Sequence, residues 1–396
     1  MKILLDYNQK ELTNVFLSLG IEKYRANQLY TAMLNGKDYS NEINLPKNVI
    51  DILKQHDFVL QPIKIVKNIK SKENNIKLLY KLSDGNLVEG MLMSYKYGNT
   101  LCVSTQVGCK MNCAFCASGL GGFVRNLTAG EILGQIVAVN KLLGGSLKER
   151  KITNVVLMGS GEPLDNFENV TKFLSLLTSE HGFNMSARNI SLSTCGIPQK
   201  IEELADYGIP VTLCISLHAP NDAIRTTIMP IARSYPINAV LDSAKYYHTI
   251  TNRRIIIEYT LIGGVNDNMK CAKELSELLR NIPCHVNLIK LNEVKERGLK
   301  APTQASCDTF LNNLHKFKVS ATMRRTIGDD VDGACGQLRN KTIKENKEMI
   351  KQKTIIKSGG RMLNSDSKSK DNKTEKHTIK TTKDIRTKKT SSLKNK

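Results

Sequence analysis

From about residue 100 onward, strand-like and helix-like segments alternate along the chain. Short apolar runs occur at Leu101–Ser104, Asn154–Met158, Asn189–Ser193, Val211–Leu217, Ile255–Leu261 and Val286–Lys290. Helical patterns separate them, over approximately Phe167–Glu180, Pro198–Tyr207, Asn238–Thr249 and Lys270–Asn281, and a capping-box pattern of Thr128 with Glu131 begins another helix. Strands separated by helices predict a parallel sheet with right-handed crossovers, either an open α/β sheet or a barrel.

The two ends of the chain differ from this core. Residues 1–58 contain short amphipathic patterns such as EKYRANQLYTAML, and residues 63–93 contain strand-like runs with the tight turn SDGN between the last two. We therefore expect an N-terminal accessory α+β domain over residues 1–95, the α/β core over 96–341 and a basic tail over 342–396. The tail is rich in Lys, Thr, Ser and Asn, so we expect it to be disordered.

Composition narrows the class of protein. A hydrophobic share of 40% is enough for a core, and no apolar run reaches the roughly 18 residues that span a bilayer. The start, MKILLDYNQKEL, reaches Asp6 too early for a signal peptide, so we expect a soluble, cytoplasmic protein with no membrane partner. The net charge of +21 favours nucleic acid as a partner. The tail from Lys341 has 18 Lys/Arg and 6 Asp/Glu, which leaves +9 on the first 340 residues.

Three of the ten cysteines lie together in QVGCKMNCAFCASG, directly after a predicted strand. Cys109, Cys113 and Cys116 can hold a soft metal centre as thiolates. Four thiolates would close an iron–sulfur cluster, whereas three leave one iron open to a small molecule. A zinc knuckle is the alternative, but it needs a fourth Cys or His nearby, as in a second C-x2-C pair, and none follows. The spacing favours an open iron–sulfur cluster.

Four more polar segments follow predicted strands: GSGEP, STCG, LHAP and KLN. Each is weak alone, because a Gly-Glu-Pro after a strand is often only a turn and a single histidine is often structural. Active sites of parallel barrels gather at the carboxyl ends of the strands. Together with the cysteine loop, these segments therefore predict an active site at that face.

The cysteine spacing resembles that of radical S-adenosylmethionine (SAM) enzymes, and the resemblance covers residues 100–340. It implies a partial (β/α)6 barrel, one 4Fe–4S cluster on the three cysteines, and SAM bound to the open iron. MGSGEP, LSTCG, ISLHAPND and NLIKLN are similar to the family's SAM-contacting segments. The implied SAM contacts are Gly161, Glu162, Ser193, Ser216, Leu217, His218 and Asn292.

IGDDVDGACGQL, LCVSTQVGC and GFVRNL resemble one group within this superfamily, the bacterial RNA adenine carbon-2 methyltransferases. The resemblance implies methylation of adenosine 2503 in the peptidyl-transferase centre of 23S rRNA and of adenosine 37 in tRNA. It implies ping-pong use of two SAM molecules, with Cys335 methylated first to S-methylcysteine, Cys102 as its disulfide partner and Glu89 as the base. The implied partners are both RNAs and an electron donor such as flavodoxin or ferredoxin, and we expect a monomer.

The sequence leaves alternatives open for the roles of these residues and for the function. Without the resemblance, Cys102 and Cys335 are better explained as core cysteines, and a lone glutamate in a strand such as Glu89 usually faces solvent. A carbon-8 rRNA adenosine methyltransferase of the antibiotic-resistance type shares the cluster and the cysteine pair. A non-enzymatic zinc-binding RNA protein is a further rival. The arginines expected near the barrel mouth are either RNA contacts or solvated surface residues: Arg125, Arg324 and Arg325. The remaining cysteines are expected to be structural: Cys195, Cys214, Cys271, Cys284 and Cys307.

Overall fold

The computed structural model describes residues 1–39, 43–325, 336–343 and 345. Its α-helices are α1 (Gln9–Ser18), α2 (Lys23–Leu34), α3 (Lys47–Gln55), α4 (Ala129–Leu142), α5 (Phe167–Thr178), α6 (Pro198–Asp206), α7 (Asp222–Ile228), α8 (Ile237–Thr251), α9 (Met269–Leu279) and α10 (Gln304–Lys316). Its strands are β1 (Lys2–Ile3), β2 (Phe58–Val59), β3 (Ile63–Lys70), β4 (Ile76–Leu82), β5 (Leu87–Tyr95), β6 (Gly98–Cys102), β7 (Gln106–Gly108), β8 (Phe123–Asn126), β9 (Ile152–Leu157), β10 (Ile190–Thr194), β11 (Thr212–Ser216), β12 (Ile255–Leu261), β13 (Cys284–Lys290) and β14 (Ala321–Met323).

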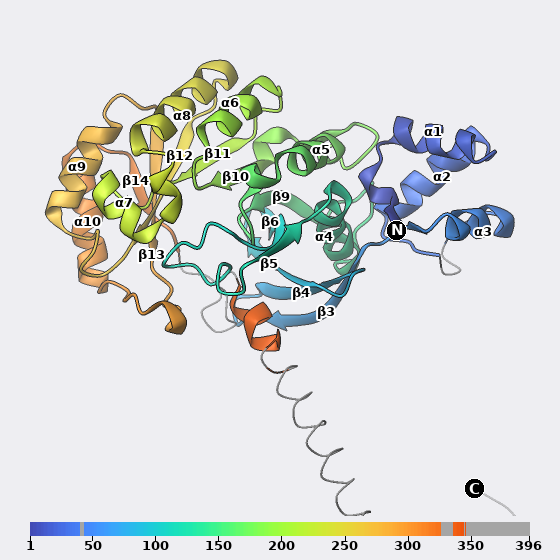
Figure 1. The fold of residues 1–396 in the computed structure, drawn as a ribbon, viewed down its shortest axis with the longest axis horizontal. Helices are drawn as coiled ribbons and strands as arrows, with labels where there is room; N and C mark the ends of the chain where they lie inside the picture. Colours follow the sequence, from blue (N-terminus) through green and yellow to red (C-terminus); the bar gives the residue numbers. More distant parts are fainter. Residues whose placement is uncertain (40–42, 326–335, 344, 346–396) are drawn as a thin grey trace, which may run out of the picture. The chain divides into compact units, whose positions relative to one another are not determined.

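One ten-stranded sheet organises the fold, in the order β14-β13-β12-β11-β10-β9-β6-β5-β4-β3. The strands from β14 to β6 are parallel, and α5, α6, α8, α9 and α10 form a layer along one side of them (Figure 1). This is the α/β partial barrel that the sequence predicts. Because parallel strands end at the same edge, the loops that follow β9, β10, β11, β12 and β13 meet there.

The sequence patterns located most elements of the barrel correctly. Strand β12 has the predicted bounds. The bounds of β9, β10, β11 and β13 differ from the predicted ones by at most two residues at either end. The capping box before α4 is confirmed, because the Thr128 hydroxyl accepts from the Glu131 N–H and the Glu131 carboxylate accepts from the Thr128 N–H. Helices α7 and α10 and strand β14 were not predicted. Of these, β14 completes the parallel end of the sheet.

The strands predicted between residues 63 and 93 do not form a separate sheet. β3, β4 and β5 are antiparallel and continue the barrel sheet from β6. Helices α1, α2 and α3 precede them, at the blue end of the ribbon in Figure 1. The boundary proposed after residue 95 falls in the turn between β5 and β6, and it stays a prediction.

Among the described residues, no helix is long and apolar enough to cross a membrane. The predicted basic tail, from residue 346 onward, and Cys335 lie outside the described residues.

Candidate active site

The loop with the three predicted cluster cysteines is closed at its base by a short hairpin. Strands β7 and β8 pair antiparallel on either side of residues 109–122, and the Cys109 N–H donates to the Gly122 carbonyl (3.2 Å). Gly108 has a φ of +80°, and a Cβ atom there would lie 1.8 Å from the Gly122 carbonyl oxygen. Only glycine permits this close approach, so the glycines in QVGC and GGFVR fix where the loop closes.

Residues distant in the sequence hold the tip of this loop. The Ala114 N–H donates to the carbonyl of Ile228 at the end of α7 (2.8 Å). The Arg297 guanidinium donates to the Cys116 carbonyl (3.1 Å) and to the Asn112 side-chain oxygen (2.7 Å). These contacts hold the loop in place through the protein's own residues.

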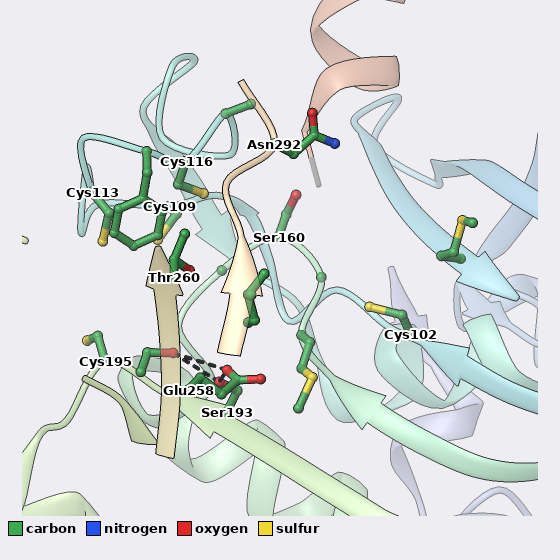
Figure 2. A pocket seen from close by; sticks show the side chains of 18 of the residues that line it. Cys102, Cys109, Cys113, Cys116, Ser160, Ser193, Cys195, Glu258, Thr260 and Asn292 are labelled. Carbon is green, nitrogen blue, oxygen red and sulfur yellow. Dashed lines mark hydrogen bonds between the residues drawn. The ribbon is translucent and has the colours of Figure 1, made fainter. Parts of the chain in front are cut away.

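A cavity of about 380 Å³ opens at the carboxyl ends of the parallel strands, and Cys109, Cys113 and Cys116 all line it (Figure 2). Burial raises the pKa of Cys109 to about 12 and raises the pKa of Cys113 as well. These thiols therefore keep their protons until a positive charge such as iron displaces them. A set of sulfur donors on one loop fits an iron–sulfur cluster.

The same cavity gives no support to a compact single-ion site. Within the described part of the chain, no three His, Cys, Asp or Glu side chains lie close enough to hold one metal ion. Structural zinc needs four ligands around one ion, whereas each cysteine of a cluster ligates a different iron.

Three polar side chains from neighbouring strands form a hydrogen-bonded group in the cavity. The Ser193 hydroxyl on β10 donates to the Glu258 carboxylate on β12 (2.6 Å). The Ser216 hydroxyl on β11 lies 3.1 Å from the Ser193 hydroxyl and 3.4 Å from the same carboxylate. Figure 2 shows Ser193 and Glu258 together, away from the three cysteines of the loop. A buried carboxylate with nearby hydroxyls can accept hydrogen bonds from the hydroxyl or ammonium groups of SAM.

The side chain of Glu162 stabilises the glycine-rich segment that follows β9. Gly161 has a φ of +111°, and a Cβ atom there would lie 2.6 Å from the Gln106 Cβ. The Glu162 carboxylate accepts from the N–H groups of Cys195 (2.8 Å) and Leu164 (3.0 Å). Burial raises the pKa of Glu162, and these hydrogen bonds oppose the rise. Gly161 and Glu162 both line the cavity, and Glu162 ties the loop after β9 to the turn after β10.

His218 lines the cavity in a backbone conformation that few residues adopt. Its φ is +57°, which costs energy for a residue with a Cβ and is common at functional sites. The Thr260 N–H donates to the His218 Nδ1 (3.0 Å), so the neutral ring carries its proton on Nε2. Burial, together with the positive charge of Arg225, lowers the pKa of His218 to about 3. The ring is therefore a neutral hydrogen-bond donor beside Phe115 of the cysteine loop.

Cys102 lies at the opposite end of the cavity from the cysteine loop (Figure 2). It is at the end of β6, opposite Met91 on β5, and it packs in a small cluster with Met91 and Met93. Cys102 is 7% exposed. It is therefore buried, as a core cysteine would be, yet its side chain borders the cavity.

Glu89 is buried rather than solvent-facing, with 2% of its surface exposed, and it lines the cavity near Cys102. Its carboxylate pairs with the buried Lys77 ammonium (2.8 Å). The same carboxylate accepts from the N–H groups of Gly336 (2.8 Å) and Arg339. Glu89 therefore joins β4, β5 and the helical turn that begins after residue 336.

Of the other predicted site residues, one lines the cavity, one does not, and one lies outside the described residues. Asn292 lines the cavity at its rim. Leu217 does not line it, because its side chain is fully buried in the main hydrophobic core. Cys335 lies outside the described residues. The expected Cys102 disulfide finds no support, since none of the nine cysteines that the structure describes forms a disulfide.

Some site residues were not predicted from the sequence. Glu258 and Lys77 are charged residues at buried positions of largely apolar strands, IIIEYTL and IKLLYKL, and a buried charge is itself a signal of function or pairing. Arg225 is also missed: it is fully buried and donates to the carbonyls of Leu217, Tyr235 and Cys195. No pattern around it marks this role.

The three arginines expected at the barrel mouth differ in their surroundings. Arg324 and Arg325 are exposed and line the cavity. Arg125 instead makes a bidentate pair with Glu131 (2.7 and 2.8 Å) and a further ion pair with Asp84 (2.7 Å). Its guanidinium therefore links β8, α4 and the β4–β5 turn.

Comparisons with known proteins agree with this geometry. Residues 103–275 match the model of the radical SAM superfamily. The chain is 47% identical over 346 residues to a protein of Clostridium perfringens described as a probable dual-specificity RNA methyltransferase RlmN, which covers 87% of this chain and 98% of that protein. A Clostridium botulinum protein of the same description is 47% identical over 342 residues, 86% of this chain and 98% of its own length. The crystal structure of a radical SAM methyltransferase from Sphaerobacter thermophilus superposes with a TM-score of 0.81 at 38% identity, covering 85% of this chain and 99% of that one.

Proposed function

Because this chain belongs to the RlmN family of dual-specificity RNA methyltransferases within the radical SAM superfamily, we propose that it methylates carbon 2 of adenosine in two RNAs. The proposed targets are adenosine 2503 of 23S rRNA and adenosine 37 of tRNA. The observation that carries the proposal is one cavity that is lined by the three cysteines of the C-x3-C-x2-C loop and also by Cys102 and Glu89. Cofactor and acceptor chemistry can therefore meet in a single space.

Carbon 2 of adenine lies between two ring nitrogens and is electron-poor, so it does not attack the methyl group of SAM directly. We assign the 4Fe–4S cluster to Cys109, Cys113 and Cys116, and SAM to the cavity beside Ser193, Ser216 and His218. When bound, the cluster and SAM supply a carbon radical that can remove hydrogen from an unactivated methyl group. The buried walls of the cavity exclude water from that step.

The methyl group must first be placed on a protein nucleophile. We assign this role to Cys335, whose thiolate attacks the methyl of a first SAM and gives S-methylcysteine with loss of S-adenosylhomocysteine. After the carbon–carbon bond to adenine has formed and the adduct has lost the carbon-2 proton and its unpaired electron, the Cys102 thiolate attacks the Cys335 sulfur. The bond between that sulfur and the methylene carbon breaks, and the methylene carbon takes a proton to become the methyl group of the released product. That step leaves a transient disulfide, which an external thiol reductant must return to two thiols. A flavodoxin or ferredoxin is the proposed electron donor for the cluster.

Glu89 is the proposed acceptor of the ring proton from carbon 2. It lines the same cavity as Cys102, which supports this role, and the Lys77 ammonium pairs with its carboxylate (2.8 Å). The two N–H groups that also donate to Glu89 keep its carboxylate in one orientation.

The target adenosine must leave its base stack to reach the cavity. Loops of folded RNA supply such bases, and the +9 charge of the first 340 residues favours contacts with the phosphates. We propose that the enzyme acts as a monomer in the cytoplasm.

Product analysis tests this proposal. The cluster is reconstituted anaerobically, and the enzyme is given SAM, a reductant and either an rRNA fragment or tRNA. Digested nucleosides are then compared by mass spectrometry with 2-methyladenosine and 8-methyladenosine standards. The proposal predicts 2-methyladenosine from both RNAs. An 8-methyl product would assign the chain to the antibiotic-resistance type, and a colourless, oxygen-stable protein without product would indicate a zinc-binding RNA protein.

A further inference from the structure

The turn between β5 and β6 carries a pair of stacked tyrosines. The ring centroids of Tyr95 and Tyr97 lie 4.9 Å apart, and their planes differ by 7°. Tyr97 is 71% exposed, more than any other large hydrophobic side chain that the structure describes. Because one face of its ring covers Tyr95, this exposure leaves the other face open to a planar ligand.

This pair is connected to the active-site cavity. The Tyr95 hydroxyl donates to the Met93 sulfur (3.6 Å), and Met93 lines the cavity together with Cys102. Tyr95 also packs against the apolar cluster of Met91, Met93 and Cys102. A continuous row of side chains thus runs from Cys102 through Met93 and Tyr95 to Tyr97 at the surface.

Positively charged side chains lie near the pair. Lys96 lies between the two tyrosines in the sequence, and Arg324 and Arg325 are close enough to Tyr95 to interact with it electrostatically. Both arginines are exposed and line the cavity. Residues 90–108 and 309–328 contain no Asp or Glu. An exposed aromatic face with cations beside it and no carboxylate in these segments fits a nucleic-acid strand better than an acidic or apolar partner.

We propose that Tyr97, supported by Tyr95, is a platform on which a nucleotide next to the target adenosine stacks, while Arg324 and Arg325 contact its phosphates. This inference rests on the proposed function, because it takes RNA as the substrate. When the target base leaves the stack, its neighbour loses a stacking partner, and the Tyr97 ring replaces it. Stacking on an aromatic ring tolerates any base, so one platform can serve two RNAs whose flanking sequences differ.

The test compares two substitutions of Tyr97. Tyr97→Leu removes the ring but keeps an apolar side chain, and Tyr97→Phe keeps the ring but removes the hydroxyl. We expect Tyr97→Leu to raise both the Kd for an rRNA fragment and the KM about tenfold, with kcat within about twofold of the wild type. Tyr97→Phe should match the wild type. Tyr246→Leu is the matched control, since Tyr246 is an exposed tyrosine on α8 (39% exposed) that does not line the cavity.

Two further measurements separate stacking from charge. A 2-aminopurine placed beside the target adenosine should lose fluorescence on binding to the wild type and keep it on binding to Tyr97→Leu. Arg325→Gln should reduce the salt dependence of binding by about one unit of slope, and Tyr97→Leu should leave that slope unchanged.

Clear outcomes would overturn the inference. Equal Kd values for Tyr97→Leu and the wild type would do so, and so would an equal loss in Tyr97→Phe, which would point to the hydroxyl. The Kd and the fluorescence are measured whether or not methylation occurs. A wild-type enzyme that binds the fragment but forms no methyladenosine would therefore contradict the proposed function and leave the platform to be judged by its own data.

Discussion

The buried pair of Lys77 and Glu89 offers a direct test of how the acceptor end of the cavity is held together. Both side chains are nearly inaccessible, at 2% and 3% exposure. Replacing Lys77 by Met removes the ammonium and leaves a buried carboxylate. Loss of one partner from such a pair costs about 3–5 kcal/mol. Because the Glu89 carboxylate keeps the N–H donors of Gly336 and Arg339, we expect about 3 kcal/mol.

The assay is equilibrium unfolding in urea, supported by thermal melting. A loss of about 3 kcal/mol corresponds to a fall in Tm of about 6–12 °C, on the basis of about 2–4 °C per kcal/mol for domains of this order of size. The double variant Lys77→Met with Glu89→Gln has no unpaired charge, so it should regain at least half of the lost stability. Lys245→Met is the control, since Lys245 and Asp242 form an exposed pair, and it should change stability by under about 0.5 kcal/mol.

A cost of under about 1 kcal/mol for Lys77→Met would contradict this expectation. Full additivity of the two separate costs in the double variant would contradict it as well, because the two side chains would then not be coupled. Either result would mean that the acceptor end of the cavity does not depend on this ion pair.

Three further predictions concern the site. Cys102→Ala should accumulate a covalent protein–RNA adduct, seen as an RNA-dependent shift on a denaturing gel, whereas free turnover would remove the resolving role from Cys102. Glu258→Gln should weaken SAM binding about tenfold in equilibrium dialysis while the iron content stays unchanged, and unchanged affinity would exclude Glu258 from SAM binding. Since the pKa of His218 is lowered to about 3, the unfolded state binds more protons below pH 6.5, so stability falls as the pH falls, by about 1.4 kcal/mol per unit from this site. His218→Asn, which tolerates the same positive φ, should reduce that pH dependence, and an equal slope in urea unfolding at pH 5–6.5 would contradict the lowered pKa.

The barrel was predictable because its strands are short apolar runs between amphipathic helices. Ile255–Leu261 shows this well, since β12 has the predicted bounds. The strands β3, β4 and β5 and the tight turn between the last two were also predicted, but their junction with the barrel sheet was not. That junction depends on the pairing of β5 with β6, and a strand's pairing partner leaves no local trace in the sequence.

Site residues that lie in sequence motifs could be predicted. Residues that reach the site only through the tertiary fold were harder to predict. Ser193 and Ser216 follow from loop motifs, but Glu258 reaches them only because β10, β11 and β12 are adjacent. Leu217 lies in a matched motif, yet its side chain points into the core, since a motif does not specify which face of the chain a residue occupies. Lys77 was missed because a lysine in an antiparallel strand is usually exposed.

In the proposed mechanism, the methyl group passes through a protein-bound sulfur and loses a hydrogen before it reaches carbon 2. The most direct measurement uses SAM with three deuteriums on its methyl group, followed by mass spectrometry of the digested RNA nucleosides. We expect 2-methyladenosine with two deuteriums from the labelled methyl group. Three retained deuteriums would mean that the methyl group was transferred intact, and would contradict the roles proposed for the cysteine loop and for Cys335.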